Sequence, residues 1–127
     1  MSKIIQGLYY SKDHEWLRVD GNAAFIGITD YAQDSLGDLV YADAEPVGSE
    51  ISIGETLGVV ESVKAASDVL SPVGLTVLEH NDEAFGDPAL INQNPYDSWL
   101  VKVTLADSGE LSGLMDADGY EAYVEAL

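Results

Sequence analysis

The 127-residue sequence contains no cysteine, which excludes disulfide bonds, thiolate catalysis and cysteine-ligated zinc. Its only histidines are His14 and His80, and neither has the spacing to a carboxylate or a second histidine that is typical of a zinc site. The segment "DADGY", which begins at Asp116, imitates a calcium loop, but its twelfth position is Leu127 where a glutamate is required. We therefore predict no metal site and interpret Asp116 as the start of a helix.

Basic residues are scarce as well. Five lysines and arginines stand against 23 aspartates and glutamates, which gives a formal net charge of −18. Nucleic acids and anionic membranes are bound by clustered basic residues, so we expect neither as a partner. No apolar run approaches the roughly 20 residues of a membrane-spanning helix, and the first residues do not resemble a targeting segment. We expect a cytoplasmic protein.

The sequence motifs of common enzymes are also missing. No serine lies in a Gly-x-Ser-x-Gly pattern, and no glycine-rich run has the spacing of a nucleotide-binding loop. With 23 acidic residues, close carboxylate pairs arise by chance and do not indicate acid–base catalysis. A hydrolase or a nucleotide-dependent enzyme is therefore unsupported.

Short apolar runs that alternate with Gly, Asn, Asp and Pro predict a mainly β protein. The predicted strands are "EWLRV", "AAFIGI", "DLVYA", "ETLGVVESV", "DVLSPV", "LTVLE" and "SWLVKVTL". A short helix is expected between Thr29 and Gly37, capped by Thr29 or Asp30, and one or two helices are expected after Ser108. We predict a single domain over residues 1–127, with a β core over about 8–105 and a C-terminal helical segment over about 108–126.

The segment "GVVESVKAASDVLSPVG", residues 58–74, can form a hairpin with Lys64 at its tip. A two-residue loop at Lys64 and Ala65 would place Glu61 opposite Asp68. Such a hairpin would lack the Asn-Gly or Asp-Gly turn that tight hairpins prefer, and it would bring two like charges together. Local conflicts of this kind are typical of functional sites, although an ordinary exposed turn lysine is the alternative interpretation.

The same segment resembles the lipoyl-attachment segment of the H-protein family of the glycine cleavage system. Further blocks that resemble the family follow the same order over nearly the whole chain: "YSKDHEWLRV", "IGITDYAQDSLGDLVY", "INQNPYDSWLVKV" and "LMDADGYEAYVEAL". The resemblance implies a barrel-sandwich hybrid, which is a flattened antiparallel barrel of two small sheets with short peripheral helices and a C-terminal helix.

The resemblance also implies a function. Lys64 matches the lysine whose ε-amine carries lipoate in amide linkage, as N6-lipoyl-lysine. The protein would be a non-catalytic carrier that takes the aminomethyl group of glycine from the P protein to the T protein and passes reducing equivalents to the L protein. We expect a monomer whose partners are these three proteins and the lipoylating enzymes.

Two sets of site residues follow from the matching positions. Lipoylating enzymes are expected to recognise residues beside the lysine, namely Glu61, Val63 and Ala65. A cleft that shelters the loaded arm is expected to include acidic and polar residues, namely Glu15, Asp68, Asp13 and Ser35. The acids could equally be ordinary surface residues, and Asp13 and Ser35 depart from the serine and histidine that are common in the family.

A further departure follows the hairpin. The family usually has Ser-Gly where this chain has Gly74 and Leu75, and an apolar residue where it has His80. A left-handed backbone at Leu75 would be strained, so we expect a locally altered turn. Two alternatives to glycine turnover also stay open at this point: a lipoyl-relay or lipoyl-signalling protein, and an unmodified interaction module.

Overall fold

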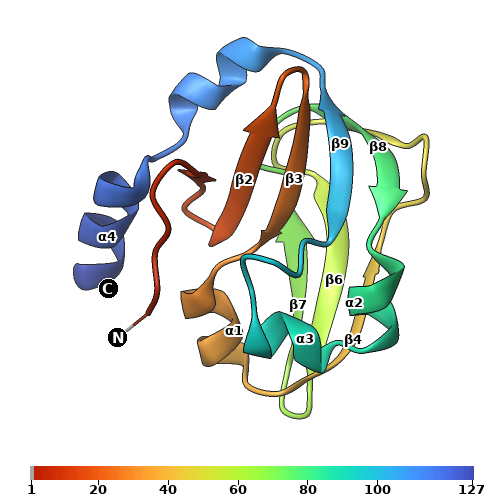
Figure 1. Cartoon of the computed structure of the whole chain (residues 1–127), viewed down its shortest axis with the longest axis vertical. Helices are drawn as coiled ribbons and strands as arrows, with labels where there is room; N and C mark the ends of the chain where they lie inside the picture. Colours follow the sequence, from red (N-terminus) through yellow and green to blue (C-terminus); the bar gives the residue numbers. More distant parts are fainter. Residues whose placement is uncertain (1) are drawn as a thin grey trace.

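The computed structural model describes residues 2–127, which form two antiparallel sheets with helices around them (Figure 1). The six-stranded sheet has the order β1 (Tyr9–Tyr10), β2 (Glu15–Asp20), β3 (Ala23–Ile28), β9 (Val101–Leu105), β8 (Leu75–His80) and β5 (Glu50–Ile51). The three-stranded sheet has the order β4 (Leu39–Ala44), β6 (Thr56–Ser62) and β7 (Ala66–Leu70). Over the described residues the two hydrogen-bonded ladders remain separate and do not close into one barrel.

Within residues 2–127, five helical segments accompany the sheets. They are α1 (Asp30–Leu36), α2 (Asp82–Gly86), α3 (Ala89–Gln93), the 3₁₀ helix η1 (Ser108–Gly113) and α4 (Ala117–Glu125). The mainly β prediction is confirmed, as are the short helix after Thr29 and the C-terminal helices. Helices α2 and α3 were not predicted, because each has only five residues and gives no periodic apolar pattern. Among the helices of residues 2–127, none has the length and apolarity that crossing a membrane requires.

The main core lies between the two sheets and is made of apolar side chains. On β9, for example, Val101, Val103 and Leu105 are buried while Lys102 and Thr104 are partly exposed, which is the alternation of a half-buried strand. The buried residues of this cluster are Leu17, Ala24, Ile26, Leu57, Val73, Leu75, Val77, Val101, Val103 and Leu105. Each such valine or leucine stabilises the fold by about 1.5–3 kcal/mol relative to an exposed position, so the core holds the sheets rigidly together.

Helix α1 begins and ends as its sequence indicates. The Thr29 side chain accepts a hydrogen bond from the Ala32 amide, and Gly37 ends the helix with a φ of 84°. This left-handed conformation is readily available to glycine. The chain then turns from Gly37 directly into β4, which pairs with β6. The end of α1 therefore lies close to the end of β6.

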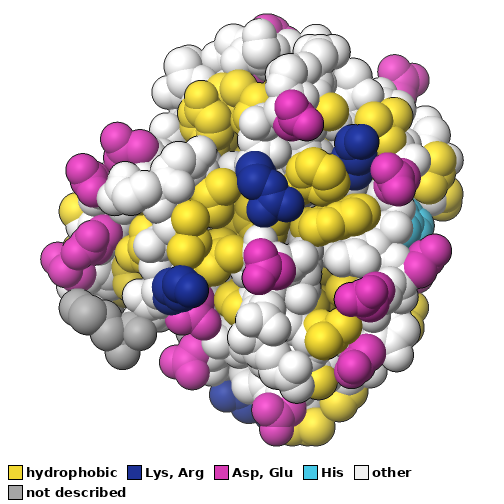
Figure 2. All heavy atoms as spheres, in the orientation of Figure 1, with side chains coloured by type: hydrophobic (Ala, Val, Ile, Leu, Met, Phe, Trp, Pro, Cys, Tyr) yellow, Lys and Arg dark blue, Asp and Glu magenta, His cyan; other side chains and the backbone are white. Residues whose placement is uncertain are grey.

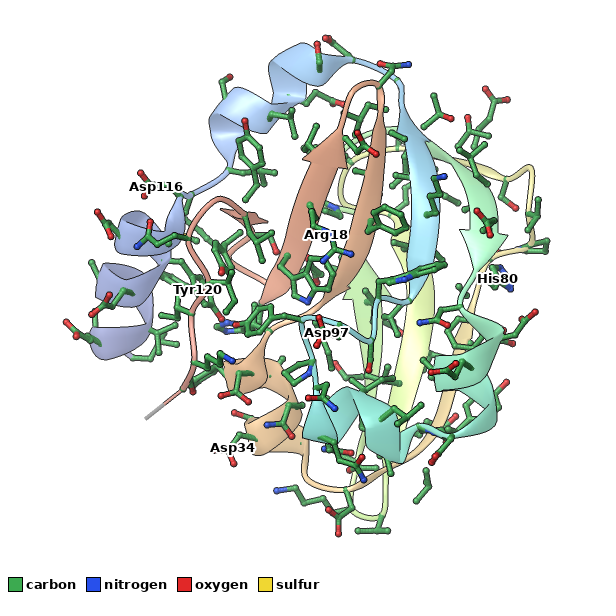
Figure 3. All side chains as sticks on the ribbon, viewed as in Figure 1. Arg18, Asp34, His80, Asp97, Asp116 and Tyr120 are labelled. Atoms are coloured by element: carbon green, nitrogen blue, oxygen red, sulfur yellow. The ribbon has the colours of Figure 1, made fainter. Side chains whose placement is uncertain are left out.

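Helix α4 packs against the first strands of the chain. The Asp116 side chain caps it by accepting a hydrogen bond from the Gly119 amide at 2.8 Å, which confirms the helix start predicted there. The Tyr120 ring, which is labelled in Figure 3 beside α4, is fully buried. It stacks on Tyr10, with ring centroids 4.6 Å apart. Burial raises the pKa of Tyr120 to about 12, so its hydroxyl stays protonated at neutral pH. The last helix is thus a fixed part of the fold.

The departures after the hairpin are accommodated without a left-handed leucine. Leu75 begins β8, and its φ is not positive. The Gly74 amide donates a hydrogen bond to Glu110 Oε1 at 2.8 Å, which connects this turn to η1. His80 Nε2 lies 2.7 Å from the carbonyl oxygen of Glu45, and its ring packs on Phe85. The turn is therefore held by contacts with other segments.

Candidate functional site

The predicted attachment lysine lies at the tip of the β6–β7 hairpin, but the hairpin has a different register from the predicted one. The Ser62 amide donates to the Ala65 carbonyl at 2.7 Å, so the two-residue loop consists of Val63 and Lys64. The prediction of a loop at Lys64 and Ala65 is therefore wrong. Glu61 pairs with Ala66 and not with Asp68.

The side chain of Ser62 explains this register. Its Oγ accepts hydrogen bonds from the amides of Lys64 and Ala65, at 3.3 and 3.1 Å. Because a serine hydroxyl closes the turn, neither central residue needs the positive φ of an Asn-Gly turn, and neither has one. The missing turn motif is thus compensated by a residue just before the tip.

The tip presents an accessible amine. Lys64 and Ala65 are exposed, and Val63 is 77% exposed. Lys64 makes no ion pair with another residue in the described part of the chain. Its Cε passes near Gly37, 3.6 Å from the position that a Cβ would take there. The amine is open to acylation, since its neighbours Val63 and Ala65 have small or short side chains and are exposed as well.

The outer face of the three-stranded sheet carries acids close to the lysine. Tyr41, Glu61 and Ala66 form one cross-strand row of paired residues, and the neighbouring row contains Val59 and Asp68. Glu61 and Asp68 are therefore diagonal neighbours, at a typical spacing of about 7–8 Å instead of the about 5 Å of a direct pair. The like-charge conflict that the sequence suggested is weaker in this register.

Glu15 lies at the start of β2 and is almost completely buried, with 2% exposure. Ser11 Oγ donates to its Oε1 at 2.6 Å, and burial raises the pKa of Glu15 to about 7. A hydrogen bond from the Leu70 backbone partly opposes this shift. Leu70 ends β7, four residues beyond Ala66, so Glu15 lies about 13 Å along the strand from Ala66, where β7 begins after the tip.

The other predicted cleft residues are exposed. Asp13 lies two residues before Glu15, and its charge adds to the pKa increase that burial causes at Glu15. At His14 the same charge partly opposes burial, which lowers the pKa of that residue. Asp68 lies on β7, and Ser35 lies in the last turn of α1. Within residues 2–127, no hydrogen bond between side chains joins Ser35 or Asp68 to Glu15. A common cleft for these residues remains a prediction.

One residue near the tip was not found from the sequence. The side chain of Asn92, on α3, makes hydrogen bonds to the loop between α1 and β4, and the Asp38 carbonyl of that loop accepts a hydrogen bond from the Val63 amide at 3.3 Å. No local signal distinguishes Asn92 from its neighbours in "INQN", because its partners are distant in sequence. Only the tertiary fold identifies it.

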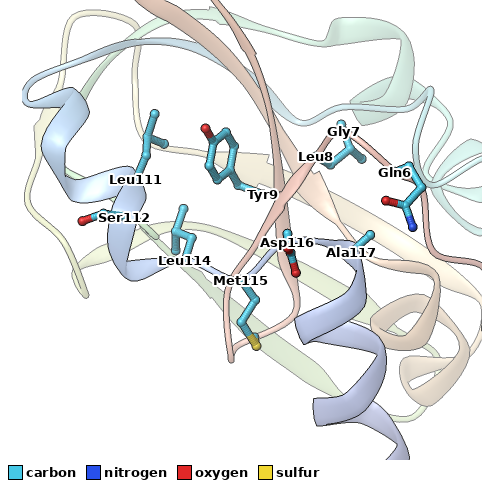
Figure 4. A pocket seen from close by; sticks show the side chains of 10 residues that line it. All are labelled: Gln6, Gly7, Leu8, Tyr9, Leu111, Ser112, Leu114, Met115, Asp116 and Ala117. Carbon is cyan, nitrogen blue, oxygen red and sulfur yellow. The ribbon is translucent and has the colours of Figure 1, made fainter.

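Other candidate sites do not involve the hairpin tip. Residues 2–127 contain no group of three or more histidine, aspartate or glutamate side chains that could hold a metal ion. Figure 4 shows a pocket between the N-terminal segment and the helices η1 and α4, lined by residues 6–9, 111, 112 and 114–117. It contains no residue of β6 or β7. The hairpin tip is therefore the strongest candidate site.

Comparisons with known proteins match one family over most of the chain. Residues 8–127 match the family model described as Glycine cleavage H-protein. The chain is 54% identical to the glycine cleavage system H protein of Thermoanaerobacter pseudethanolicus, with 97% of this chain and 98% of that protein covered. It is 48% identical to the mitochondrial glycine cleavage system H protein 2 of Arabidopsis thaliana, with 98% and 80% covered.

A solved structure has a similar fold over nearly the whole chain. The crystal structure of a glycine cleavage system H protein from Mycobacterium marinum is similar with a TM-score of 0.87 and 36% identity, and 98% of this chain and 100% of that chain are covered. The match to the family model includes the hairpin, both sheets and the C-terminal helix. The chain therefore belongs to the glycine cleavage H-protein family.

Proposed function

We propose that this protein is the lipoyl carrier of a glycine cleavage system, with lipoate attached to Nζ of Lys64. The observation that carries the proposal is the position of Lys64. It is an exposed lysine at the tip of a two-residue turn, in a chain that matches the H-protein family over residues 8–127. The family resemblance of "ESVKA" supports the same residue.

The residues of the tip fit an attached acyl chain. Ala65 and Ala66 are small, and Glu61 pairs with Ala66 across the hairpin. When bound, lipoate supplies a disulfide that can accept an aminomethyl group and electrons. This chain keeps the attachment point on a rigid two-sheet body, so that a long side chain can reach several active sites at a raised effective concentration. In this role residues 1–127 act as one monomeric, non-catalytic carrier domain.

The partners in this proposal are the P, T and L proteins of the system and the lipoylating enzymes. Glu61, Val63 and Ala65 are the residues that a lipoylating enzyme would contact beside the lysine. Exposure supports this role for Val63 and Ala65. Positive surfaces on the partners would complement the acidic surface of this chain, whose visible face in Figure 2 carries many more acidic than basic side chains.

The proposed shelter for the loaded arm involves Glu15, Asp13, Asp68 and Ser35. Glu15 is buried against Ser11 at the end of β7, so it can meet a ligand only if this end of the strand opens. An ionised Glu15 would then accept a charge-assisted hydrogen bond from a cationic amine. Asp13 and Asp68 are already exposed and add negative charge near the same path.

The test uses Lys64→Arg with Lys12→Arg as the matched control, since both lysines are exposed. Arginine keeps the charge but is a very poor nucleophile near neutral pH, so Lys64→Arg should not gain the mass of a lipoyl group. It should also fail to support glycine decarboxylation by the P protein, whereas Lys12→Arg should behave like the natural sequence. Decarboxylation supported by Lys64→Arg would contradict the proposal.

A further inference from the structure

We propose that Asn92 is a positioning residue for the modification of Lys64, because its side chain holds the loop Gly37–Leu39 against the hairpin tip. This inference rests on the proposed function of Lys64 as the attachment site. Asn92 does not touch the lysine, so its effect on the modification acts through the loop.

The amide group of Asn92 uses both of its polar atoms on this part of the molecule. Its Oδ1 accepts a hydrogen bond from the Leu39 amide at 2.9 Å. Its Nδ2 donates to the Gly37 carbonyl and to Gln33 Oε1, each at 2.9 Å. One side chain from α3 therefore fixes the loop on both sides of Asp38 and also contacts the last turns of α1.

The loop in turn contacts the tip at successive points. Leu39 pairs with Ser62, which is the residue whose hydroxyl closes the turn. The Asp38 carbonyl accepts the Val63 amide at 3.3 Å, and the Lys64 Cε lies beside Gly37. Every residue from Ser62 to Lys64 thus meets the loop that Asn92 holds.

A lipoylating enzyme needs Lys64 in one orientation. In the reaction, an enzyme-held lipoyl adenylate transfers its acyl group to Nζ of Lys64, which forms the amide, releases AMP and gives up a proton to solvent. The reacting atoms must come close together with a defined geometry. If the loop is released, the hairpin tip populates more orientations, and the apparent kcat/KM falls with the fraction that is competent.

The decisive variant is Asn92→Asp, which keeps the size of the side chain and the acceptor for Leu39 but loses both donated hydrogen bonds. Its control is Asn81→Asp. Asn81 is also partly buried, and its Nδ2 donates to the carbonyl of Trp99 at 2.8 Å. Within residues 2–127 its side chain makes no hydrogen bond to the loop Gly37–Leu39. Both variants are compared at a temperature at which circular dichroism shows them to be fully folded.

We expect kcat/KM for lipoylation, with a lipoate–protein ligase, lipoate and ATP, to fall about tenfold for Asn92→Asp and to stay within about twofold for Asn81→Asp. A milder variant, Gln33→Leu, removes only one acceptor of Asn92 and should give a smaller fall, which keeps the test open if Asn92→Asp folds poorly. An unchanged rate for Asn92→Asp, or equal losses in the two asparagine variants, would overturn the proposal.

A second measurement separates this inference from the proposed function. In the unmodified chain, the ¹⁵N–{¹H} nuclear Overhauser effects of Val63 and Lys64 report the mobility of the tip on the ps–ns timescale. They should fall in Asn92→Asp and remain unchanged in Asn81→Asp. If the natural chain is never lipoylated, the proposed function fails, while unchanged Overhauser effects in Asn92→Asp would show that Asn92 does not hold the tip.

Discussion

Glu15→Gln should change how the stability of this protein depends on pH. The Glu15 side chain is 2% exposed and accepts a hydrogen bond from Ser11 at 2.6 Å. Glutamine keeps the size of the side chain and one acceptor oxygen, but it cannot ionise. The substitution therefore removes one titration and little packing.

The magnitude follows from the pKa of Glu15, which burial raises from 4.5 to about 7. Because the folded state holds this proton more tightly than the unfolded state, the unfolding free energy falls as pH rises through this interval and is level above it. At 1.36 kcal/mol per pKa unit, the full loss of unfolding free energy is about 3 kcal/mol, and about 2–3 kcal/mol of it occurs between about pH 5 and pH 8.

The titration of His14 changes the unfolding free energy in the opposite direction, so its effect must be separated from that of Glu15. Burial lowers the pKa of His14, so its contribution to stability is lost as pH falls below its ordinary value near 6.5. The pH dependence of the unfolding free energy of the natural protein contains both effects. The difference between the natural protein and Glu15→Gln isolates the glutamate.

Urea unfolding at about pH 5 and about pH 8 measures the effect. On raising the pH, the natural protein should lose about 2–3 kcal/mol of unfolding free energy relative to Glu15→Gln. Asp13→Asn is the control, because Asp13 is exposed and should cause a much smaller difference. A constant difference between the natural protein and Glu15→Gln at the two pH values would refute the reasoning.

Three further predictions follow. Gly27→Ala places a Cβ 2.6 Å from the Trp16 ring, so it should lower the unfolding free energy by about 1–3 kcal/mol and alter the tryptophan fluorescence. In the control Gly113→Ala the new Cβ meets no atom within 4 Å and should cause neither effect, and equal Tm values for the two variants would contradict this prediction. Tyr120→Phe removes the hydroxyl 2.8 Å from His14 Nδ1 and should lower the unfolding free energy by about 1–2 kcal/mol in urea titration, and no loss would mean that the hydroxyl is dispensable. The KM of the P protein for the lipoylated chain should rise with salt as the Debye length shortens to about 8 Å, whereas a flat response would indicate apolar docking.

Elements with strong local signals could be predicted from the sequence. The run "AAFIGI" coincides with β3, and Thr29 and Gly37 mark the ends of α1 as their capping chemistry requires. The hairpin was also expected, because two apolar runs flank a short polar segment. Its register was not, since strand pairing depends here on the Ser62 side chain, and a turn shifted by one residue changes every pair.

The candidate site was only partly predictable for the same reason. The position of Lys64 at the tip followed from the sequence and the family resemblance. The burial of Glu15 did not, because it depends on Ser11 and on the end of β7, which only the tertiary fold brings near. Helix α3 gave no periodic signal, so Asn92 and its contacts with the loop could not be anticipated.

The packing of α4 has a consequence for how the chain is completed during synthesis. Tyr10 pairs with Met115 and stacks on Tyr120. Strand β1 can therefore be packed against these residues only after the C-terminal segment has left the ribosome. Every partner of the Lys64 tip, in contrast, precedes residue 93. The modification site can therefore form before the body of the protein is closed. A released chain truncated just short of residue 117 would present a formed tip on an unfinished fold.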